Sequence, residues 1–254
     1  MTPSIIRNLW SSLRPQQWLK NLFVFSAVIF TGRLFEPLQV LKSLAVFLLF
    51  CLLSGAGYLI NDVIDRRSDQ FHPHKRQRPV ADGRLRSSVA VITALVLMVV
   101  GLGASVFIGR AVGYTLGGYT ALTLAYSAWL KQFMIVDIIV VALGYVLRVL
   151  AGGFAIGVIS TPWSLACTFF LAACISVGKR LSERRALEQP GNHRAVLDQY
   201  PQALLNRLLL ITAAFTIMAY ILFTFASGKD VKLIITIPFV LYGVLRYIRL
   251  VKTA

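Results

Sequence analysis

The sequence predicts an all-α protein, a polytopic membrane helical bundle of about eight transmembrane helices with a cytoplasmic N-terminus. Of its 254 residues, 57% are hydrophobic and only 14% are charged, whereas a soluble globular domain has roughly 25% charged residues. The apolar residues come in long runs, as helices that cross a bilayer require. Runs such as "AVITALVLMVV" also lack the alternating polar residues of a membrane β-barrel. We therefore expect residues 1–254 to form a single integral membrane domain.

Eight runs of the sequence are apolar enough to cross a bilayer, although the first is shorter than the about 20 residues usually needed. No removable signal peptide is expected, because the N-terminus lacks the order of basic, apolar and small residues that precedes a cleavage site. The three cysteines lie in apolar runs without metal-site spacing and are expected to be small core residues. The expected spans are residues 18–33, 41–60, 88–109, 112–130, 134–158, 162–178, 203–226 and 231–250.

The net charge of +16 comes from Lys and Arg in short segments between the apolar runs. This distribution is typical of membrane topology signals and argues against nucleic acid as a partner. With the N-terminus in the cytoplasm, the inner segments carry twenty basic residues and the outer segments five. The sequence thus predicts a multi-pass membrane protein whose large loops 61–87 and 179–202 lie on the cytoplasmic side.

The N-terminal segment 1–17 is expected to lie on the membrane surface rather than to cross it. Its apolar residues recur at helical spacing, with two arginines on the opposite face. The apolar residues are Ile5, Ile6, Leu9, Trp10 and Leu13, and the arginines are Arg7 and Arg14.

The stretch "NDVIDRRSD" follows the second expected span and contains four oxygen-bearing side chains. If it continues as a helix, Asn61, Asp62, Asp65 and Asp69 share one narrow arc, since each residue turns by about 100°. Carboxylates one turn apart repel each other, whereas Mg²⁺ binds oxygen ligands and shares its shell with substrate phosphates. The sequence therefore predicts a magnesium site. The alternative is a solvated loop in which Asp62 pairs with Arg66, and Asp65 with Arg67 or Arg66.

Three cations follow the acidic stretch and are candidate ligands for phosphate oxygens. They are Lys75, Arg76 and Arg78. The alternative for each is the ordinary excess of basic residues in cytoplasmic loops. His72 and His74 flank a proline in the same loop and are interpreted as incidental.

The expected fourth and fifth spans carry further polar candidates, namely Tyr126, Lys131, Asp137 and Arg148. Asp137 and Arg148 are three helical turns apart on one face, about 16 Å from end to end. An arginine this deep in a span normally faces the bundle interior or a wet cavity, so it is a candidate for binding an anion that reaches into the membrane. The alternative is an internal salt bridge or a clamp on backbone carbonyls.

The second large loop opens with "GKRLSE", which offers Lys179, Arg180 and Glu183. Lys179 and Arg180 are candidates for a phosphate. Because Lys179 and Glu183 are one turn apart, an ordinary ion pair along a helix is the alternative.

These motifs together resemble the UbiA-like superfamily of intramembrane prenyltransferases. The resemblance covers nearly the whole chain and includes "RPQQWLKN", "NDVIDRRSDQFHPHKRQRPVADG", "YSAWLKQFMIVDIIVVALGYVLRVLAGG", "VGKRLSERRALE" and "IPFVLYGVLRYIRLV". In that superfamily the Asn-Asp-x-x-Asp-x-x-x-Asp motif holds Mg²⁺ against a diphosphate leaving group. Most members carry a second aspartate-rich motif where this chain reads "GKRLSE". That departure resembles the decaprenyl-phosphate phosphoribosyltransferase branch.

The resemblance implies an enzyme that transfers a 5-phosphoribosyl group from phosphoribosyl diphosphate to a polyprenyl phosphate and releases diphosphate. It implies Asp62, Asp65 and Asp69 as catalytic residues, Mg²⁺ as the cofactor and supply of a cell-wall precursor as the context. It also implies a bacterial plasma membrane, with the active site on the cytoplasmic side in the loops 61–87 and 179–202. Lys20, in "RPQQWLKN", joins the substrate-binding candidates. The alternatives are prenyl transfer from a polyprenyl diphosphate to an aromatic or other small acceptor, and a transporter or flippase.

Members of the superfamily typically have nine spans, and this sequence shows eight, so the ninth helix is expected to be missing or cut off. The sequence leaves a homo-oligomer open.

Overall fold

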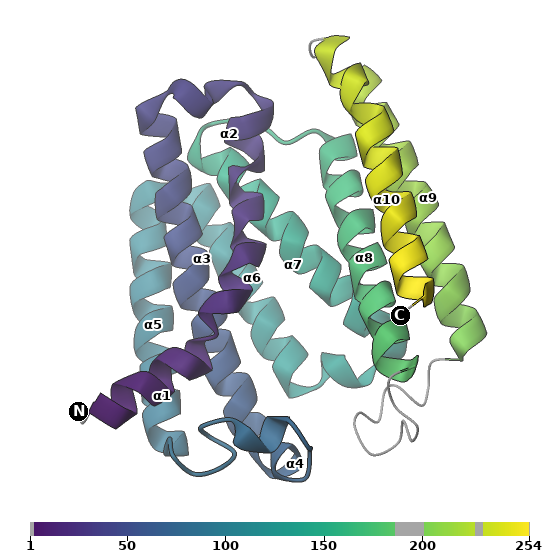
Figure 1. The fold of residues 1–254 in the computed structure, drawn as a ribbon. Coiled ribbons are helices and arrows are strands. Elements are labelled where there is room, and N and C mark those ends of the chain that lie inside the picture. The colour runs from purple at the N-terminus through teal and green to yellow at the C-terminus, as the bar shows by residue number, and fades with distance from the viewer. Residues whose placement is uncertain (1–2, 186–200, 227–230, 254) are drawn as a thin grey trace. The chain divides into compact units, whose positions relative to one another are not determined.

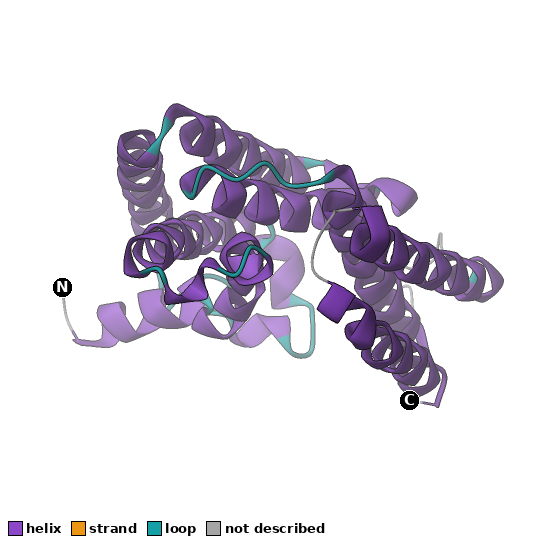
Figure 2. Cartoon of the chain, turned by 90° about the horizontal axis from the view of Figure 1, so that it is seen from above, coloured by secondary structure: helices purple, strands orange, loops and turns teal. Residues whose placement is uncertain are grey.

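In the computed structural model, residues 3–185, 201–226 and 231–253 are described, and within these ranges the chain forms helices and no strand (Figure 2). The chain divides into two compact units. Unit 1 comprises residues 1–130 and 147–159, and unit 2 comprises residues 131–146 and 160–254. The all-α fold predicted from composition is confirmed, and the single domain over 1–254 stays a prediction.

Unit 1 begins with α1 (Pro3–Leu13), the 3₁₀ segment η1 (Pro15–Phe25), α2 (Ser26–Phe30) and the 3₁₀ turn η2 (Arg33–Phe35). The long helix α3 (Pro37–Ile64) follows and leads into α4 (Arg66–Gln70) and the 3₁₀ turn η3 (Lys75–Gln77). The helices α5 (Ser87–Ile108) and α6 (Arg110–Ala128) pack on α3 and meet at Gly109. In Figure 1, α1 and α4 both lie toward the end of α3 where that helix finishes.

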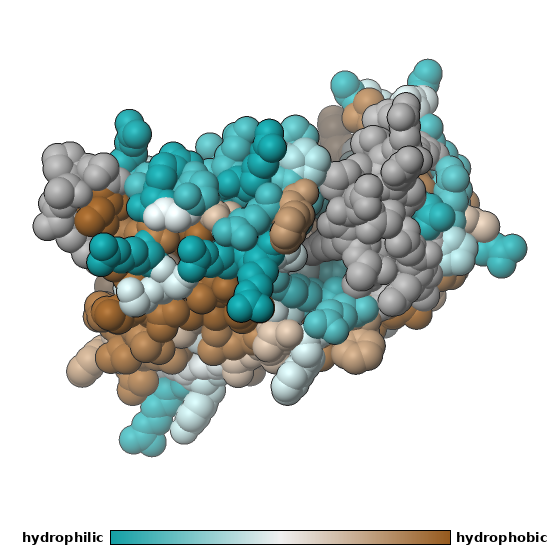
Figure 3. Space-filling model, turned by 90° about the horizontal axis from the view of Figure 1, so that it is seen from below, coloured by the Kyte–Doolittle hydropathy of each residue, from teal (hydrophilic) through white to brown (hydrophobic). Residues whose placement is uncertain are grey.

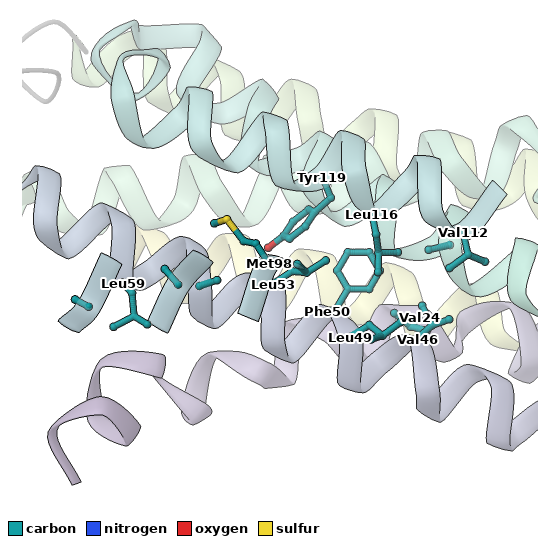
Figure 4. Packing of buried hydrophobic residues seen from close by; sticks show 14 of the residues in the cluster. Val24, Val46, Leu49, Phe50, Leu53, Leu59, Met98, Val112, Leu116 and Tyr119 are labelled. Carbon is teal, nitrogen blue, oxygen red and sulfur yellow. The ribbon is translucent and has the colours of Figure 1, made fainter. Parts of the chain in front are cut away.

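The core of unit 1 forms where α3, α5 and α6 meet (Figure 4). Phe50 of α3 is fully buried, and its ring lies edge-on to the ring of Tyr119 with centroids 5.0 Å apart. Leu53 and Leu116 fill the adjacent positions from α3 and α6. Burial of a large apolar side chain stabilises a fold by about 1.5–3 kcal/mol in water. Within a bilayer, close packing of such side chains against each other stabilises the helices instead.

The helix α7 (Met134–Ala155) is preceded by the 3₁₀ turn η4 (Leu130–Gln132) and contributes its first residues to unit 2 and its last to unit 1. Unit 2 also contains α8 (Pro162–Arg185), α9 (Gln202–Ala226), the 3₁₀ segment η6 (Val231–Thr236) and α10 (Ile237–Thr253). The helices α8, α9 and α10 pack side by side (Figure 1). Small residues of α8, including Ala172 and Ala173, meet fully buried leucines such as Leu205 and Leu209 of α9.

Six helices of the described residues are long and apolar enough to cross a membrane, which makes this a multi-pass membrane protein. They are Pro37–Ile64, Ser87–Ile108, Ile135–Ala155, Pro162–Arg184, Gln202–Phe225 and Leu233–Thr253. The expected span 112–130 forms α6, but its many Gly, Thr and Tyr residues lower its hydropathy. The expected span 18–33 is built from η1 and α2 rather than one continuous α-helix. The count of eight spans therefore stays a prediction, as does the cytoplasmic N-terminus.

The surface around α4 is hydrophilic. Figure 3 views the molecule from the side on which α4 lies in Figure 1, and hydrophilic residues gather over this end of unit 1. On α4 and in the loop after it, Arg66, Arg67, Gln70 and His74 are exposed. This polar end is where the sequence predicted the acidic motif.

Candidate functional site

The acidic motif forms a nearly continuous helix at the end of α3. Asp65 stands between α3 and α4, but its backbone N–H donates to the carbonyl of Asn61 at 2.9 Å. The N–H of Asp69 in turn donates to the carbonyl of Asp65 at 2.8 Å. These are helical bonds between residues four apart, and they keep the four oxygen-bearing side chains in the register that the sequence predicted.

Two of the three aspartates are buried and converge on one cation. Asp62 is 1% exposed and Asp69 is 3% exposed. They are seven residues apart, which is two helical turns, so they lie on the same face. Nη1 of Arg78 donates to Oδ1 of Asp62 at 3.3 Å and to Oδ2 of Asp69 at 2.6 Å. A single nitrogen therefore marks a position within reach of both carboxylates.

The other two members of the motif contact each other. Nδ2 of Asn61 donates to Oδ2 of Asp65 at 3.0 Å, across one helical turn. Both side chains are half-buried, beside the fully buried Asp62. Arg66, which the alternative interpretation paired with Asp62, donates instead to the hydroxyl of Ser87 at 3.4 Å. The partners of Asp62 are arginines distant in sequence.

One of these distant arginines, Arg14, was not among the candidate site residues. It lies between α1 and η1, and its Nη2 forms an ion pair with Oδ1 of Asp62. Its guanidinium also lies over the ring of Tyr58, with 4.8 Å from Cζ to the ring centroid. Burial lowers the pKa of Arg14, and the carboxylate of Asp62 opposes that shift. The sequence shows that Arg14 precedes Pro15, which favours the end of a helix there but does not indicate the contact with Asp62.

The donor set at this site suits Mg²⁺ with a phosphorylated ligand rather than Mg²⁺ alone. Among residues 3–185, 201–226 and 231–253, no group of three His, Cys, Asp or Glu side chains could hold a metal ion by itself. Mg²⁺ is usually bound by one or two carboxylates and completes its shell with water and substrate phosphates. The convergence of Asp62 and Asp69 on one cationic nitrogen meets that requirement.

The remaining candidates of unit 1 lie on three different elements. Lys20 is half-buried on η1, and Tyr126 is half-buried near the end of α6. Lys75 and Arg76 lie on η3, where Lys75 is half-buried and Arg76 is exposed. Of the three cations that follow the motif, the structure brings Arg78 onto the acidic residues.

Arg148 is buried in unit 1 among neutral polar and aromatic groups. Its Nε donates to Oδ1 of Asn21 at 2.8 Å, and its Nη2 donates to the hydroxyl of Tyr119 at 3.0 Å. Its Cζ lies 4.7 Å from the ring centroid of Tyr119 and 5.3 Å from that of Phe50. Asn21 is itself fully buried, and its Nδ2 contacts Sγ of Cys51 at 3.3 Å. These contacts fix the orientation of the guanidinium.

A second charged cluster lies within unit 2. Asp137 accepts two bonds from Arg180, at 2.7 Å from Nε and 3.2 Å from Nη2. Both side chains are buried. Nη1 of Arg180 also donates to Glu183 at 2.9 Å, and Lys179 approaches the same carboxylate at 3.8 Å. The helical ion pair that the sequence offered as an alternative for Lys179 is therefore present, while Arg180 has a bidentate partner on α7.

The structure thus brings together two sets of predicted residues. Unit 1 joins Asp62, Asp69 and Arg78, and adds Arg14. Unit 2 joins Asp137 with the cluster at the end of α8. Lys131 lies half-buried on η4. Most of the predicted loop 179–202 lies outside the described residues, but its candidates Lys179, Arg180 and Glu183 belong to α8.

Comparison with proteins of known sequence gives several relatives. The chain is 33% identical over 219 residues to a decaprenyl-phosphate phosphoribosyltransferase of Corynebacterium glutamicum. The match covers 84% of this chain and 66% of the relative. A protein of the same name from Mycolicibacterium smegmatis is 31% identical over 231 residues, covering 89% of this chain and 73% of the relative. The chain therefore spans about two thirds to three quarters of the length of these two relatives.

Comparison with solved structures identifies the fold. A UbiA homolog from Archaeoglobus fulgidus bound to DMAPP and Mg²⁺ superposes with a TM-score of 0.82 at 20% sequence identity. The match covers 97% of this chain and 87% of that one. The sequence profile of the UbiA prenyltransferase family matches residues 22–254. With that match over most of its length, its relatives and its acidic motif, the chain belongs to the UbiA prenyltransferase family.

Proposed function

We propose that this protein is a Mg²⁺-dependent phosphoribosyltransferase that moves a 5-phosphoribosyl group from phosphoribosyl diphosphate to a polyprenyl phosphate. The observation that carries the proposal is the convergence of two buried carboxylates, Asp62 and Asp69, on one cation position. Two carboxylates supply only part of the coordination shell of Mg²⁺, so they suit a metal ion whose remaining ligands come from a bound diphosphate and water.

The choice of donor rests on the relatives and on the composition of unit 2. Four relatives at 31–33% identity are named decaprenyl-phosphate phosphoribosyltransferase. Phosphoribosyl diphosphate carries a 5-phosphate in addition to its diphosphate, and the acceptor brings a third anionic group. A substrate set of this charge favours cations such as Lys179 and Arg180 over the second acidic motif that most members of the superfamily carry.

The reaction exchanges one bond at the anomeric carbon of ribose. The bond to diphosphate breaks with its electron pair leaving on the diphosphate, and an oxygen of the lipid phosphate forms the new bond. Asp62 and Asp69, with Asn61 and Asp65 beside them, would hold Mg²⁺, which when bound neutralises charge on the leaving diphosphate. The lipid phosphate is already an anion at neutral pH, so the chain needs no general base.

The cations of the chain have the role of binding and orienting the anionic groups. Arg78, Lys75, Arg76 and Lys20 are proposed for the diphosphate, and Lys179 and Arg180 for the 5-phosphate. Lys131 and Arg148 are proposed for the phosphate of the lipid. Asp137 and Glu183 orient Arg180 through the bonds described above, and Tyr126 is proposed to bind the sugar hydroxyls. We place this chemistry on the cytoplasmic side of a bacterial plasma membrane.

The test is a comparison of labelled donors with the purified protein in detergent. Phosphoribosyl diphosphate and a polyprenyl phosphate with Mg²⁺ are expected to give a labelled lipid product, and a chelator is expected to abolish it. Labelled prenyl diphosphate with aromatic acceptors is expected to give none. Product from the prenyl donor alone would replace this proposal by prenyl transfer, and failure of both donors would favour a transporter, which needs two compartments.

A further inference from the structure

Arg14 reaches the acidic motif because α1 ends against one face of α3. Gly55, Tyr58 and Asp62 follow each other along this face at intervals of three and four residues. A Cβ added to Gly55 would lie 2.8 Å from Cδ2 of Leu13, the last residue of α1. The next residue, Arg14, then lies over the ring of Tyr58 and pairs with Asp62. The docking of α1 therefore sets the position of the guanidinium.

The backbone at Arg14 adopts a conformation that a non-glycine residue rarely takes. Its φ is 53° and its ψ is 64°, in the left-handed region. Among the described residues it is the one non-glycine residue with positive φ. Such a conformation costs on the order of 1–3 kcal/mol and persists where the surrounding structure enforces it. The ion pair, the Tyr58 ring and the docked Leu13 supply that enforcement.

Arg14 and Arg78 bond to the same oxygen of the motif. Oδ1 of Asp62 accepts from Nη2 of Arg14 and, at 3.3 Å, from Nη1 of Arg78. Arg78 also holds Asp69, whereas Arg14 bonds to no other acidic residue of the motif than Asp62. A metal ion bound by that oxygen has to displace a guanidinium. A metal ion at the position shared by Asp62 and Asp69 takes the place of Nη1 of Arg78, and it then competes with Arg14 for Oδ1 of Asp62.

We propose that Arg14 is an internal counter-ion that competes with the divalent cation for Asp62 and makes metal binding depend on the diphosphate. This inference rests on the proposed function, and it assigns a positioning role to a residue outside the acidic motif. Two guanidinium groups beside Asp62 repel a free cation, because like charges this close cost energy in a partly buried site. The diphosphate supplies the negative charge that offsets this repulsion and compensates the arginine released from Asp62.

The experiment measures Mn²⁺ binding to the purified full chain in detergent by electron paramagnetic resonance, with and without inorganic diphosphate. Arg14→Gln is compared with the wild type, and Arg7→Gln is the matched control, because Arg7 is an exposed arginine of the same segment. Asp62→Asn identifies the signal that comes from this site. Without diphosphate, Arg14→Gln is expected to bind Mn²⁺ about tenfold more tightly than the wild type, a usual size for coupling between two ligands.

The direction of the effect separates competition from a structural role. If Arg14 only supported the fold, its replacement would weaken Mn²⁺ binding. The variant Arg14→Lys keeps the positive charge and is expected to bind Mn²⁺ with an affinity near that of the wild type. With saturating diphosphate the difference between wild type and Arg14→Gln is expected to close. Equal or weaker Mn²⁺ binding by Arg14→Gln without diphosphate would overturn the inference while leaving the proposed function intact. If the wild type shows no Mn²⁺ signal dependent on Asp62, even with diphosphate, both fail.

Discussion

At the scale of single residues, arginine has three different environments in this protein. Arg180 meets a buried carboxylate with two parallel bonds, and Arg148 lies over two aromatic rings. Arg14 combines one ion pair, with Asp62, and one aromatic ring, that of Tyr58. A planar guanidinium with five donors suits all three, whereas the compact ammonium of lysine suits none as well. The exposed cations of the chain, such as Lys179, have no comparable geometric demand.

The buried pair in unit 2 gives the first prediction. Asp137→Asn removes the bidentate carboxylate partner of the buried Arg180 and leaves the carboxylate of Glu183 beside it. Breaking a buried ion pair typically costs about 3–5 kcal/mol. The apparent melting temperature in detergent and the midpoint of unfolding in dodecyl sulfate are expected to fall clearly. Lys179→Gln is the control, since its side chain is 68% exposed and a surface pair contributes at most about 1 kcal/mol. Equal losses from the two variants would contradict this energetic ranking.

The acidic motif gives a prediction about activity. Asp62→Asn and Asp69→Asn each remove a charge from the proposed metal position, and loss of about 3 kcal/mol of charge stabilisation corresponds to at least about 100-fold in turnover. The assay follows transfer of labelled phosphoribosyl groups to lipid over a range of Mg²⁺ concentrations. Asp82→Asn, an exposed aspartate of the same loop, is expected to retain wild-type activity. Near wild-type turnover of the Asp69 variant in saturating Mg²⁺ would remove the metal assignment.

At the scale of elements, glycine decides how closely two segments of unit 1 approach. A Cβ added to Gly152 of α7 would lie 2.0 Å from the carbonyl oxygen of Val24 in η1. Backbone cannot yield as the end of a flexible side chain does, so this position excludes any side chain. By contrast, a Cβ added to Gly118 of α6 would meet no atom outside its own helix backbone and its chain neighbours within 4 Å.

The corresponding prediction compares two single methyl additions. Gly152→Ala is expected to destabilise the protein by about 3 kcal/mol or more, because overpacking against backbone forces α7 and η1 apart. Gly118→Ala is expected to be neutral or to stabilise α6 by up to about 1 kcal/mol through helix propensity. Thermal unfolding in detergent measures both. A Gly152→Ala variant as stable as Gly118→Ala would show that the two segments are not in contact.

Prediction from sequence succeeded where one local pattern decides the outcome. Long apolar runs fix most of the spanning helices, and helical spacing placed Asp62 and Asp69 on one face, as the structure shows. The 3₁₀ geometry of η1 has no comparable signature. The pairing of Arg14 with Asp62 joins residues 48 positions apart and depends on where α1 docks. A single sequence carries no local signal for that contact.

At the scale of the whole molecule, the distribution of positive charge predicts which end of the bundle faces the cytoplasm. The helix α5 connects the loop that carries the acidic motif to the turn at Gly109. Its 22 residues span about 33 Å, enough to cross the apolar layer once. The two ends of α5 therefore lie on opposite sides of the membrane, and labelling them tests the orientation.

Cysteines placed at these two ends test the predicted topology. In a variant with Cys51, Cys167 and Cys174 changed to Ala, His74→Cys and Arg110→Cys are introduced singly, since both positions are exposed. In right-side-out vesicles, a membrane-impermeant maleimide is expected to label position 110 directly. It is expected to label position 74 only after the vesicles are permeabilised, because basic residues stay on the cytoplasmic side. The opposite labelling pattern would reverse the orientation and place the acidic motif outside.

The length of α3 also determines the depth at which the acidic motif lies. Between Lys42 and Asn61 the helix carries an apolar stretch of about 27 Å, close to the about 30 Å hydrocarbon thickness of a bilayer. Asn61 and Asp62 then lie at the boundary of the acyl chains, and Asp65 and Asp69 lie one and two turns farther out, among lipid head groups. A polyprenyl phosphate carries its own phosphate at that same level. In the proposed reaction, the lipid acceptor would therefore react with its tail still in the membrane, and the water-soluble sugar donor would reach it from the aqueous side.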